Sequence, residues 1–308
     1  MCSSDLGAGR QKHRSSHGMT MDGPITPFTH PFRRRRWTIG VVHVLLVLAS
    51  LLFIFPTLWM LSTSLKPVEE TMSAEPTWIP QVTQWSNYRE MIHYIPFAKY
   101  TANTLLVSVL AALGTVISSA LVAYSFTRLE WPGRDLLFGL TLATMMVPFP
   151  VLMVPLYSVF RALGWIGTLK PLWFPSFFGG AFNVFLLRQF FARIPKHLSE
   201  AMALDGASEL AIFGRIYVPL ARPALAVVAF FQFTYSWNDF LGPLLYLSDQ
   251  NTFTLSLGLQ SYQSQLGGTA WHLLMAASLL TTLPIMVLFF FLQKTFLRGI
   301  TVMQSVEA

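Results

Sequence analysis

The chain has 308 residues, of which 53% are hydrophobic types and only 11% are Asp, Glu, Lys or Arg. Soluble domains usually carry about 25% charged residues, and disordered chains combine low hydrophobicity with high charge. The composition therefore argues against both classes and indicates a membrane protein. A net charge of +7 is compatible with nucleic-acid binding, but the placement of the basic residues indicates membrane topology instead.

Residues 1–36 are polar, rich in Gly, Pro, Ser and His, and end in consecutive arginines. We expect this stretch to be a disordered cytoplasmic tail. Its first residues, Met-Cys-Ser-Ser-Asp-Leu, resemble the translation of a sequencing adapter, so we expect the natural start at Met19 or Met21. The single cysteine, Cys2, excludes an internal disulfide framework.

Long apolar segments follow. A membrane helix needs about 20 apolar residues, because the hydrocarbon core is about 30 Å thick and each helical residue rises about 1.5 Å. The third segment contains Pro148, Pro150 and Pro155, which indicate either a broken helix beside a cavity or a kink that only shapes packing. The six expected spans are residues 39–61, 102–124, 136–160, 171–187, 223–241 and 270–293.

The distribution of Lys and Arg predicts the orientation of these spans. If the N-terminus is cytoplasmic, sixteen of the 21 Lys and Arg residues fall in cytoplasmic segments. Cytoplasmic loops carry an excess of Lys and Arg. We therefore expect both termini to face the cytoplasm.

The loop between the fourth and fifth segments has the pattern of two short helices. Pro195 suits the first turn of a helix. Gly206 permits a backbone break, and a second helix is expected over residues 208–218, ending before Pro219. The residues predict an elbow at the membrane surface.

The first half of this elbow has features of a contact surface. Ala201 and Ala203 are small enough for another protein to approach closely, and Glu200 is an anion that a cationic partner could bind. The alternative is an amphipathic surface helix that binds no partner.

The elbow resembles the EAA loop of ABC importer permeases, whose pattern is Glu-Ala-Ala, then Asp-Gly-Ala, then Ile-x-Leu-Pro. Two positions depart from the pattern: Met202 replaces the second Ala of the triplet and Val218 replaces the usual Leu. The matching residues are Glu200, Ala201, Asp205, Gly206, Ala207, Ile216 and Pro219.

The resemblance implies an all-α membrane protein with six transmembrane helices, the type I ABC importer permease fold with cytoplasmic EAA coupling helices. It covers about residues 37–300. Residues 301–308 form a cytoplasmic tail that departs from the usual family ending, so tail contacts with the ATPase are not expected to be typical. In the family, the loop around Glu200 to Pro219 docks into a cleft of a separate ATPase subunit, and Glu200 would pair with a Lys or Arg there.

The resemblance is closest to the carbohydrate branch of the family. Trp237, Asn238 and Asp239 combine an aromatic ring with hydrogen-bonding groups, which suits contact with a sugar in the substrate pathway. The alternative is that these residues lie at the outer membrane interface, where Trp is common and Asp is hydrated.

A polar loop follows the fifth segment, over residues 249–268. The resemblance implies that it reaches an extracytoplasmic solute-binding protein. Sequence alone indicates only a flexible loop. The contact candidates are Gln260, Ser261, Tyr262 and Gln263.

Motifs for catalysis and for cofactors are absent from the sequence. No G-x-x-x-x-G-K-[ST], H-E-x-x-H, paired Cys or carboxylate cluster is present. The histidines of the spans, His43 and His272, are expected to be packed or interfacial. We therefore expect no cofactor and no metal on this chain, with ATP and Mg used by a partner ATPase.

These inferences predict a non-enzymatic, multi-pass permease subunit of a bacterial inner-membrane ABC sugar importer. Its expected partners are a second permease subunit in a heterodimer, two ATPase subunits, a solute-binding protein and the lipid bilayer, with no nucleic acid. Alternatives are the same fold importing a polyamine, phosphate or an amino acid, a membrane-embedded enzyme, and an ATP-independent channel or secondary transporter.

Overall fold

The structure is a computed structural model that describes residues 32–73, 75–263 and 268–305. Within these ranges the chain forms helices and turns, with no β-strand. It divides into two units, Met1–Ile54 and Phe55–Ala308. The adapter-like residues and the expected tail up to residue 31 lie outside the described ranges.

The described part of the first unit belongs to α1, Phe32–Ser64. Residues 39–54 are exposed and almost entirely apolar, as a lipid-facing helix requires. Two polar side chains bond to their own helix: His43 Nδ1 lies 2.7 Å from the Ile39 carbonyl, and the Ser50 hydroxyl donates to the Leu46 carbonyl. The helix already includes residues 32–36, which corrects the expected tail boundary. Arginine favours helix, so the arginine run continues α1.

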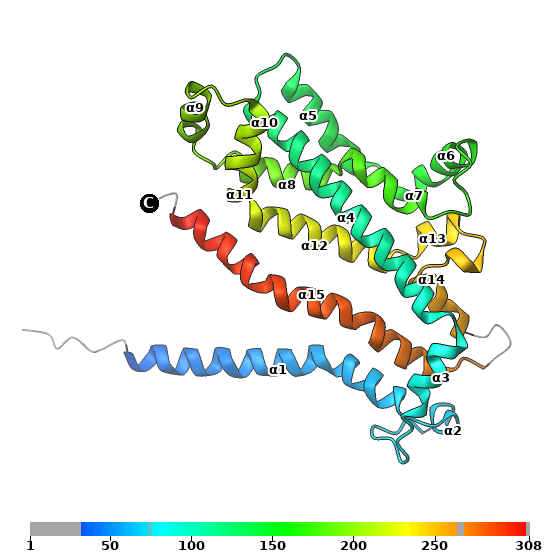
Figure 1. Cartoon of the computed structure of the whole chain (residues 1–308). Coiled ribbons are helices and arrows are strands. Elements are labelled where there is room, and N and C mark those ends of the chain that lie inside the picture. The colour runs from blue at the N-terminus through cyan, green and yellow to red at the C-terminus, as the bar shows by residue number, and fades with distance from the viewer. Residues whose placement is uncertain (1–31, 74, 264–267, 306–308) are drawn as a thin grey trace, which may run out of the picture. The chain divides into compact units, whose positions relative to one another are not determined.

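The second unit is built around α4, Phe97–Arg128, which packs against α8, η2, α12 and α14. Figure 1 shows α4 running from beside α14 to beside α10. The remaining elements, in chain order, are α2 Val68–Thr71, α3 Ser86–Tyr94, α5 Arg134–Ala143, η1 Thr144–Met146, α6 Phe149–Ala162, α7 Lys170–Trp173, η2 Phe174–Phe178, α8 Ala181–Phe191, α9 Lys196–Leu204, α10 Glu209–Ile212, η3 Phe213–Tyr217, α11 Val218–Leu220, α12 Arg222–Asn238, α13 Leu241–Tyr246, η4 Gln250–Thr252, α14 Leu255–Leu259, η5 Gln260–Tyr262 and α15 Trp271–Ser305.

Three of the six expected spans are single helices that are long and apolar enough to cross a membrane. They are Ile39–Ser64, Phe97–Arg128 and Trp271–Lys294. Two further candidates are bent helix pairs, so the described residues contain three to five candidate spans.

The third expected span, residues 136–160, is broken. Its halves, Arg134–Met146 and Phe149–Ala162, meet at 101°. Pro148 disfavours the helical conformation of the residue before it, and Val147 is accordingly extended, with φ −81° and ψ 114°. The proline cluster therefore breaks this helix rather than only kinking it.

The fourth expected span, residues 171–187, is not one helix. It divides into α7, the 3₁₀ segment η2 and α8, and α8 has 11 residues. Gly179 separates η2 from α8 with φ 81° and ψ 143°, a positive-φ conformation that glycine adopts readily. The fifth expected span corresponds to α12, which has 17 residues and follows Glu209–Leu220 at a bend of 79°.

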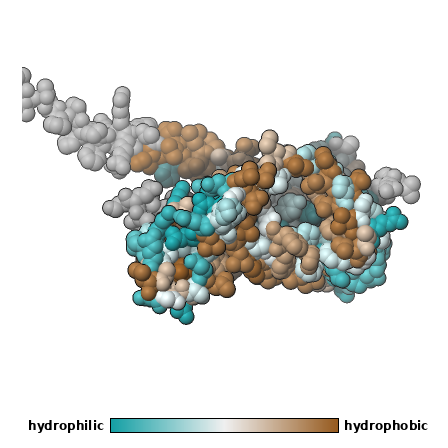
Figure 2. All heavy atoms as spheres, turned by 90° about the horizontal axis from the view of Figure 1, so that it is seen from above, coloured by the Kyte–Doolittle hydropathy of each residue, from teal (hydrophilic) through white to brown (hydrophobic). Residues whose placement is uncertain are grey.

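Two apolar cores lie at the two ends of α4. The C-terminal core of α4 joins its last turns to α8, α10, η3 and α12, and includes Tyr124, Leu187, Ile212 and Tyr217. The N-terminal core joins its first turn to α3, α14 and α15. Figure 2 shows apolar surface between hydrophilic areas on the face it presents. Apolar surface of this extent is expected where lipid or other membrane helices cover a protein.

Candidate functional site

The elbow begins with α9, which ends at Leu204, two residues before Gly206. Pro195 is the N-cap residue of α9 and not part of its first turn, a shift of one position from the expectation. The Gly206 N–H donates to the Ala203 carbonyl at 3.0 Å, and the Ala207 N–H donates to the Met202 carbonyl at 3.0 Å. This pair of bonds is a Schellman motif, which ends a helix at a left-handed residue.

Gly206 has a φ of 80°, and a Cβ added there would meet no heavy atom within 4 Å. The backbone conformation, and not crowding, therefore explains the glycine. Its place between the two helical arms agrees with the expected break.

The second arm is longer than expected. Ser208 caps it, accepting from the Ala211 N–H at 3.4 Å. The arm runs through α10, the π-helical segment η3 and α11, and so does not end before Pro219. Pro219 is in the first turn of α11, which is a position where a helix tolerates proline. π-Helical segments occur frequently at functional sites.

The residues of the EAA pattern divide into an exposed group and a packed group. Met202, Ala207 and Ile216 pack against the C-terminal core of α4, and Pro219 is half-buried. The exposed group, which a partner could touch, contains Glu200, Ala201, Asp205 and Gly206.

Two leucines beside Gly206 extend the exposed surface. Leu204 is 89% exposed and Leu210 is 74% exposed. Sequence reasoning missed both, although an apolar residue on each side of a polar Asp-Gly turn was a visible signal. Glu200 and Leu204 are one turn apart on α9 and therefore share a face, while Leu210 exposes a second leucine on α10. Exposed apolar side chains beside an acid suit a protein partner.

The inward face of the elbow is tied to the last turns of α4. Arg128 donates to the hydroxyl of Ser199, which is 2% exposed and belongs to α9. The Tyr124 hydroxyl donates to the carboxylate of Glu209, the first residue of α10. Two α4 side chains, one helical turn apart, therefore hold both arms of the elbow.

Tyr217 fills the space between these contacts. Its ring lies edge-on to Tyr124 at 4.9 Å and to Phe191 at 5.4 Å, and the Arg128 guanidinium is 5.8 Å from its centroid. Edge-on aromatic pairs and cations over aromatic faces are both favourable. The second arm is thus packed against α4 and α8 through one buried tyrosine.

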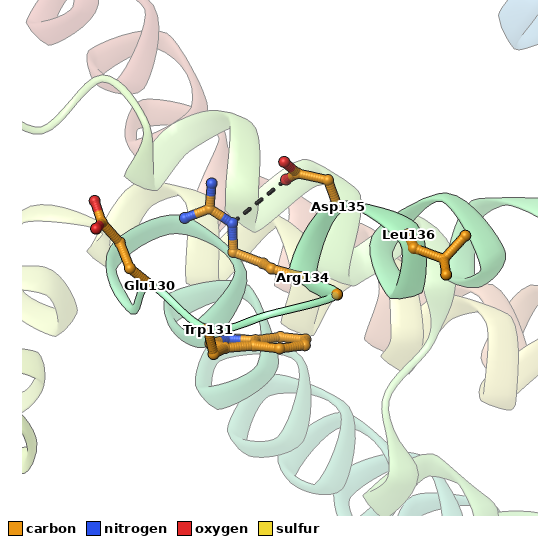
Figure 3. A pocket seen from close by; sticks show the side chains of 6 residues that line it. Glu130, Trp131, Arg134, Asp135 and Leu136 are labelled. Atoms are coloured by element: carbon orange, nitrogen blue, oxygen red, sulfur yellow. Dashed lines mark hydrogen bonds and ion pairs between the residues drawn. The ribbon is translucent and has the colours of Figure 1, made fainter.

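The turn that follows α4 forms a shallow hollow of about 360 Å³. Figure 3 shows Arg134 directed toward Asp135, with their atoms Nε and Oδ1 3.3 Å apart, while Glu130 stands apart from this pair. The Trp131 Nε1–H donates to the Ser125 hydroxyl, and Arg134 donates to the Leu129 carbonyl. These bonds hold the turn closed beside α4.

Comparison with known proteins shows which family contains a chain with this elbow. Residues 116–302, which include the elbow, match the family described as binding-protein-dependent transport system inner membrane component. The chain belongs to this family. It is therefore an inner-membrane permease of an ABC importer.

Two relatives from Bacillus subtilis (strain 168) match over most of their lengths. The probable ABC transporter permease protein YurM is 32% identical over 87% of this chain and 89% of its own. The arabinooligosaccharides transport system permease protein AraQ is 32% identical over 83% of this chain and 92% of its own.

A solved structure also matches the fold. It belongs to a bacterial ABC transporter that imports the acidic polysaccharide alginate, and it aligns with a TM-score of 0.74 and 24% identity. The match covers 88% of this chain and 100% of that one. The permease therefore has the helical fold of an ABC importer permease.

The structure revises the expected substrate residues. The Trp237 side chain of the permease is 2% exposed, its Nε1–H donates to the Thr281 carbonyl at 3.0 Å, and its ring stacks on Phe233 at 5.5 Å. This indole is packed between α12 and α15 and is no open platform for a sugar. Asn238 is exposed and bonds to the Thr234 carbonyl of its own helix.

Asp239 ends α12 and turns the chain toward α13. Its carboxylate accepts from the Gly242 N–H at 3.1 Å, and a Cβ at Gly242 would stand 2.4 Å from Oδ2. The acid therefore holds a close turn of its own backbone, which explains its presence without a solute.

The residues expected to contact the binding protein differ in exposure, and the contact itself stays a prediction. Gln260, Ser261 and Gln263 are exposed and border a hollow of about 500 Å³. Tyr262 is 1% exposed, and its hydroxyl donates to the Met91 carbonyl at 2.8 Å. The Tyr262 side chain thus anchors the loop from inside and is not available as a contact. Burial raises the pKa of this hydroxyl, so it stays a donor at higher pH than an exposed tyrosine would.

Metal ligands do not cluster in the described part of the permease, where no group of three or more His, Cys, Asp or Glu is placed to hold an ion. His272 is packed at the start of α15, with 4% of its surface exposed.

Proposed function

We propose that the permease moves an oligosaccharide across the bacterial cytoplasmic membrane and couples this movement to ATP hydrolysis on separate subunits. The observation that carries the coupling role is the elbow itself: an exposed surface of Glu200, Leu204 and Leu210 on two short helices whose inner face is bonded to α4. A surface of this kind is suited to a partner that must also move a membrane helix.

The topology of the proposal follows from charge and length. The proposed topology has six transmembrane segments, of which the third and the fourth are interrupted. With a cytoplasmic N-terminus, the elbow and both termini lie in the cytoplasm, together with most of the Lys and Arg residues. The interrupted segments are tolerated where protein neighbours satisfy the freed backbone groups.

The proposed assembly contains this permease, a second permease subunit, two ATPase subunits and an extracytoplasmic solute-binding protein. ATP and Mg²⁺ bind the ATPase subunits, and this chain binds no cofactor. Closure of the ATPase pair moves the elbow, and the membrane helices follow by alternating access. Glu200 pairs with a cation of the ATPase, because an exposed acid beside apolar side chains suits a charged rim around an apolar contact.

An oligosaccharide is the proposed solute because the relative AraQ is named for arabinooligosaccharide transport. Polyamines, phosphate and amino acids remain the alternative solutes. A polyamine is disfavoured because the described acid near the end of α12, Asp239, is occupied by a backbone turn.

The test of the coupling role is co-purification. The permease is expressed with the products of its neighbouring genes, solubilised and isolated as wild type, as Glu200→Lys and as Leu204→Asp. Wild type is expected to retain an ATPase and a second permease, whereas both variants lose the ATPase. Glu130→Lys is the control, because it makes the same charge change on an exposed residue outside the elbow. Retention of the ATPase by both elbow variants refutes the proposed docking surface.

The solute is tested separately in proteoliposomes of the assembled complex. Uptake of labelled arabinotriose and maltotriose is compared with uptake of spermidine, phosphate and glutamine. Uptake of an oligosaccharide alone supports the proposal, and uptake of one of the other three assigns the alternative solute.

A further inference from the structure

The outstanding feature of the second unit is that α4 is bonded to other elements at both of its ends. Its C-terminal end holds the elbow, and its N-terminal end holds the loop of residues 249–263. In Figure 1 the two ends of α4 lie beside α10 and α14, at opposite ends of the helix. The elbow and this loop are the surfaces assigned above to the ATPase and to the solute-binding protein.

The N-terminal attachment is made by polar side chains of α4 on backbone groups of the loop. Asn103 donates to the carbonyls of Asn251 and Phe253, at 3.1 and 3.0 Å. The Thr104 hydroxyl is fully buried and accepts from the Leu255 N–H at 2.7 Å. A bond between buried polar groups is expensive to break, because the group left behind has no water.

Close packing adds to these bonds. A Cβ at Gly258 of α14 would stand 2.3 Å from Cδ2 of Tyr100, so the loop backbone lies directly against the first turn of α4. Tyr100 itself is 3% exposed. Residues 253–258 therefore cannot move far without moving the start of α4.

The C-terminal attachment is equally direct. Tyr124 and Arg128 bond to Glu209 and Ser199, one on each arm of the elbow, and both arms also touch the C-terminal core of α4. A shift of the elbow therefore displaces the end of α4.

Between its attachments α4 is unbroken. Its 32 residues contain no proline, and at about 1.5 Å per residue they span about 48 Å. By contrast, the α5–α6 and α11–α12 segments bend by 101° and 79°. A straight helix held at both ends transmits displacement, whereas a bent pair absorbs part of it at the break.

We propose that α4 couples the 249–263 loop to the elbow, so that a displacement at one end of the helix is transmitted to the other end. The positioning residues are Asn103, Thr104, Tyr124 and Arg128. This proposal rests on the proposed function. Through α4, a loaded binding protein docked on the loop alters ATP hydrolysis by the ATPases docked on the elbow. By reciprocity, the state of the ATPases alters the affinity for the binding protein through the same residues.

The test uses the assembled complex in proteoliposomes. ATP hydrolysis is measured without binding protein, with ligand-free binding protein, and with binding protein plus arabinotriose or maltotriose. Thr104→Val removes the acceptor at one end of α4, and Tyr124→Phe removes the donor at the other. Each is expected to lower the stimulation of hydrolysis by loaded binding protein about fivefold or more, with basal hydrolysis and complex yield retained.

Two matched controls separate this effect from general weakening of α4. Thr101 and Thr127 are neighbours of the two attachments, and their hydroxyls donate to carbonyls of α4 itself. Thr101→Val and Thr127→Val are therefore expected to keep wild-type stimulation. Thr104→Ser, which restores a hydroxyl, is expected to rescue the Thr104→Val loss.

The double variant decides whether the two ends act in series. If α4 carries the signal, Thr104→Val combined with Tyr124→Phe loses no more stimulation than either change alone, because one broken attachment already interrupts it. Wild-type stimulation in both single variants, or losses that multiply in the double variant, overturns the proposal.

Failure of the wild-type chain to assemble with an ATPase refutes the proposed function instead. If Thr104→Val lowers complex yield, Asn103→Ala replaces it in the same comparison. If Tyr124→Phe lowers complex yield, Arg128→Lys replaces it.

Discussion

Gly114 of α4 lies directly under the ring of Phe177 in η2, so closely that a Cβ at position 114 would stand 2.4 Å from Cδ2 of that ring. The neighbouring α4 hydroxyl of Ser118 donates to the Ser176 carbonyl at 3.2 Å. The irregular segment between α7 and α8 is therefore seated on α4, which satisfies a backbone group freed by its broken helix.

Replacing Gly114 by Ala forces Phe177 to move. We expect Gly114→Ala to lower the free energy of unfolding by about 1–3 kcal/mol, as overpacked substitutions do. The measurement is the midpoint of thermal unfolding in detergent, followed by fluorescence-detected size exclusion. Gly139→Ala is the control, since a Cβ at Gly139 in α5 meets nothing within 4 Å. An unchanged midpoint for Gly114→Ala contradicts the close contact.

The left-handed Gly206 predicts an order of substitutions. Asn tolerates this conformation, whereas a β-branched residue resists it. We expect Gly206→Asn to retain the ATPase in co-purification and Gly206→Val to lose most of it, with a conformational penalty of about 1–2 kcal/mol for Val. Because no atom crowds the position, equal behaviour of the two variants argues against backbone conformation as the reason for the glycine.

The buried Trp237 predicts a stability effect and no solute effect. Trp237→Phe removes the Nε1 donor from the Thr281 carbonyl, and we expect it to lower the free energy of unfolding by about 1–3 kcal/mol. The KM for transported oligosaccharide is expected to stay at the wild-type value. A raised KM with an unchanged melting midpoint restores Trp237 as a solute contact.

Adjacent residues of the contact loop are expected to behave differently. Tyr262→Phe removes the bond to the Met91 carbonyl and is expected to destabilise the permease by about 0.5–1.5 kcal/mol. Gln263→Ala, at an exposed position, is expected to leave the melting midpoint unchanged and to weaken binding-protein affinity. Affinity is measured by titrating binding protein against ATP hydrolysis. Weakened affinity confined to Tyr262→Phe reverses this assignment.

The features that depend on local chemistry were predictable from the sequence. Low charge and long apolar runs indicated a membrane protein, and the family match confirms it. Gly206 marked the break in the elbow, because only a residue without a Cβ adopts the left-handed conformation freely. The proline cluster at 148–155 indicated a broken or kinked helix for a similarly local reason, and the 101° bend shows that it is broken.

Which polar and aromatic residues face inward depends on contacts between helices, and these could not be predicted from the sequence. Trp237 and Tyr262 look like ligand contacts in the sequence, yet both are packed and bonded to carbonyls distant in the chain. The attachments of α4 to residues 251–255 and to Ser199 and Glu209 join positions 71 to 151 residues apart. Neither periodicity nor motif spacing predicts these pairings, because the pairings depend on how separate helices pack against each other.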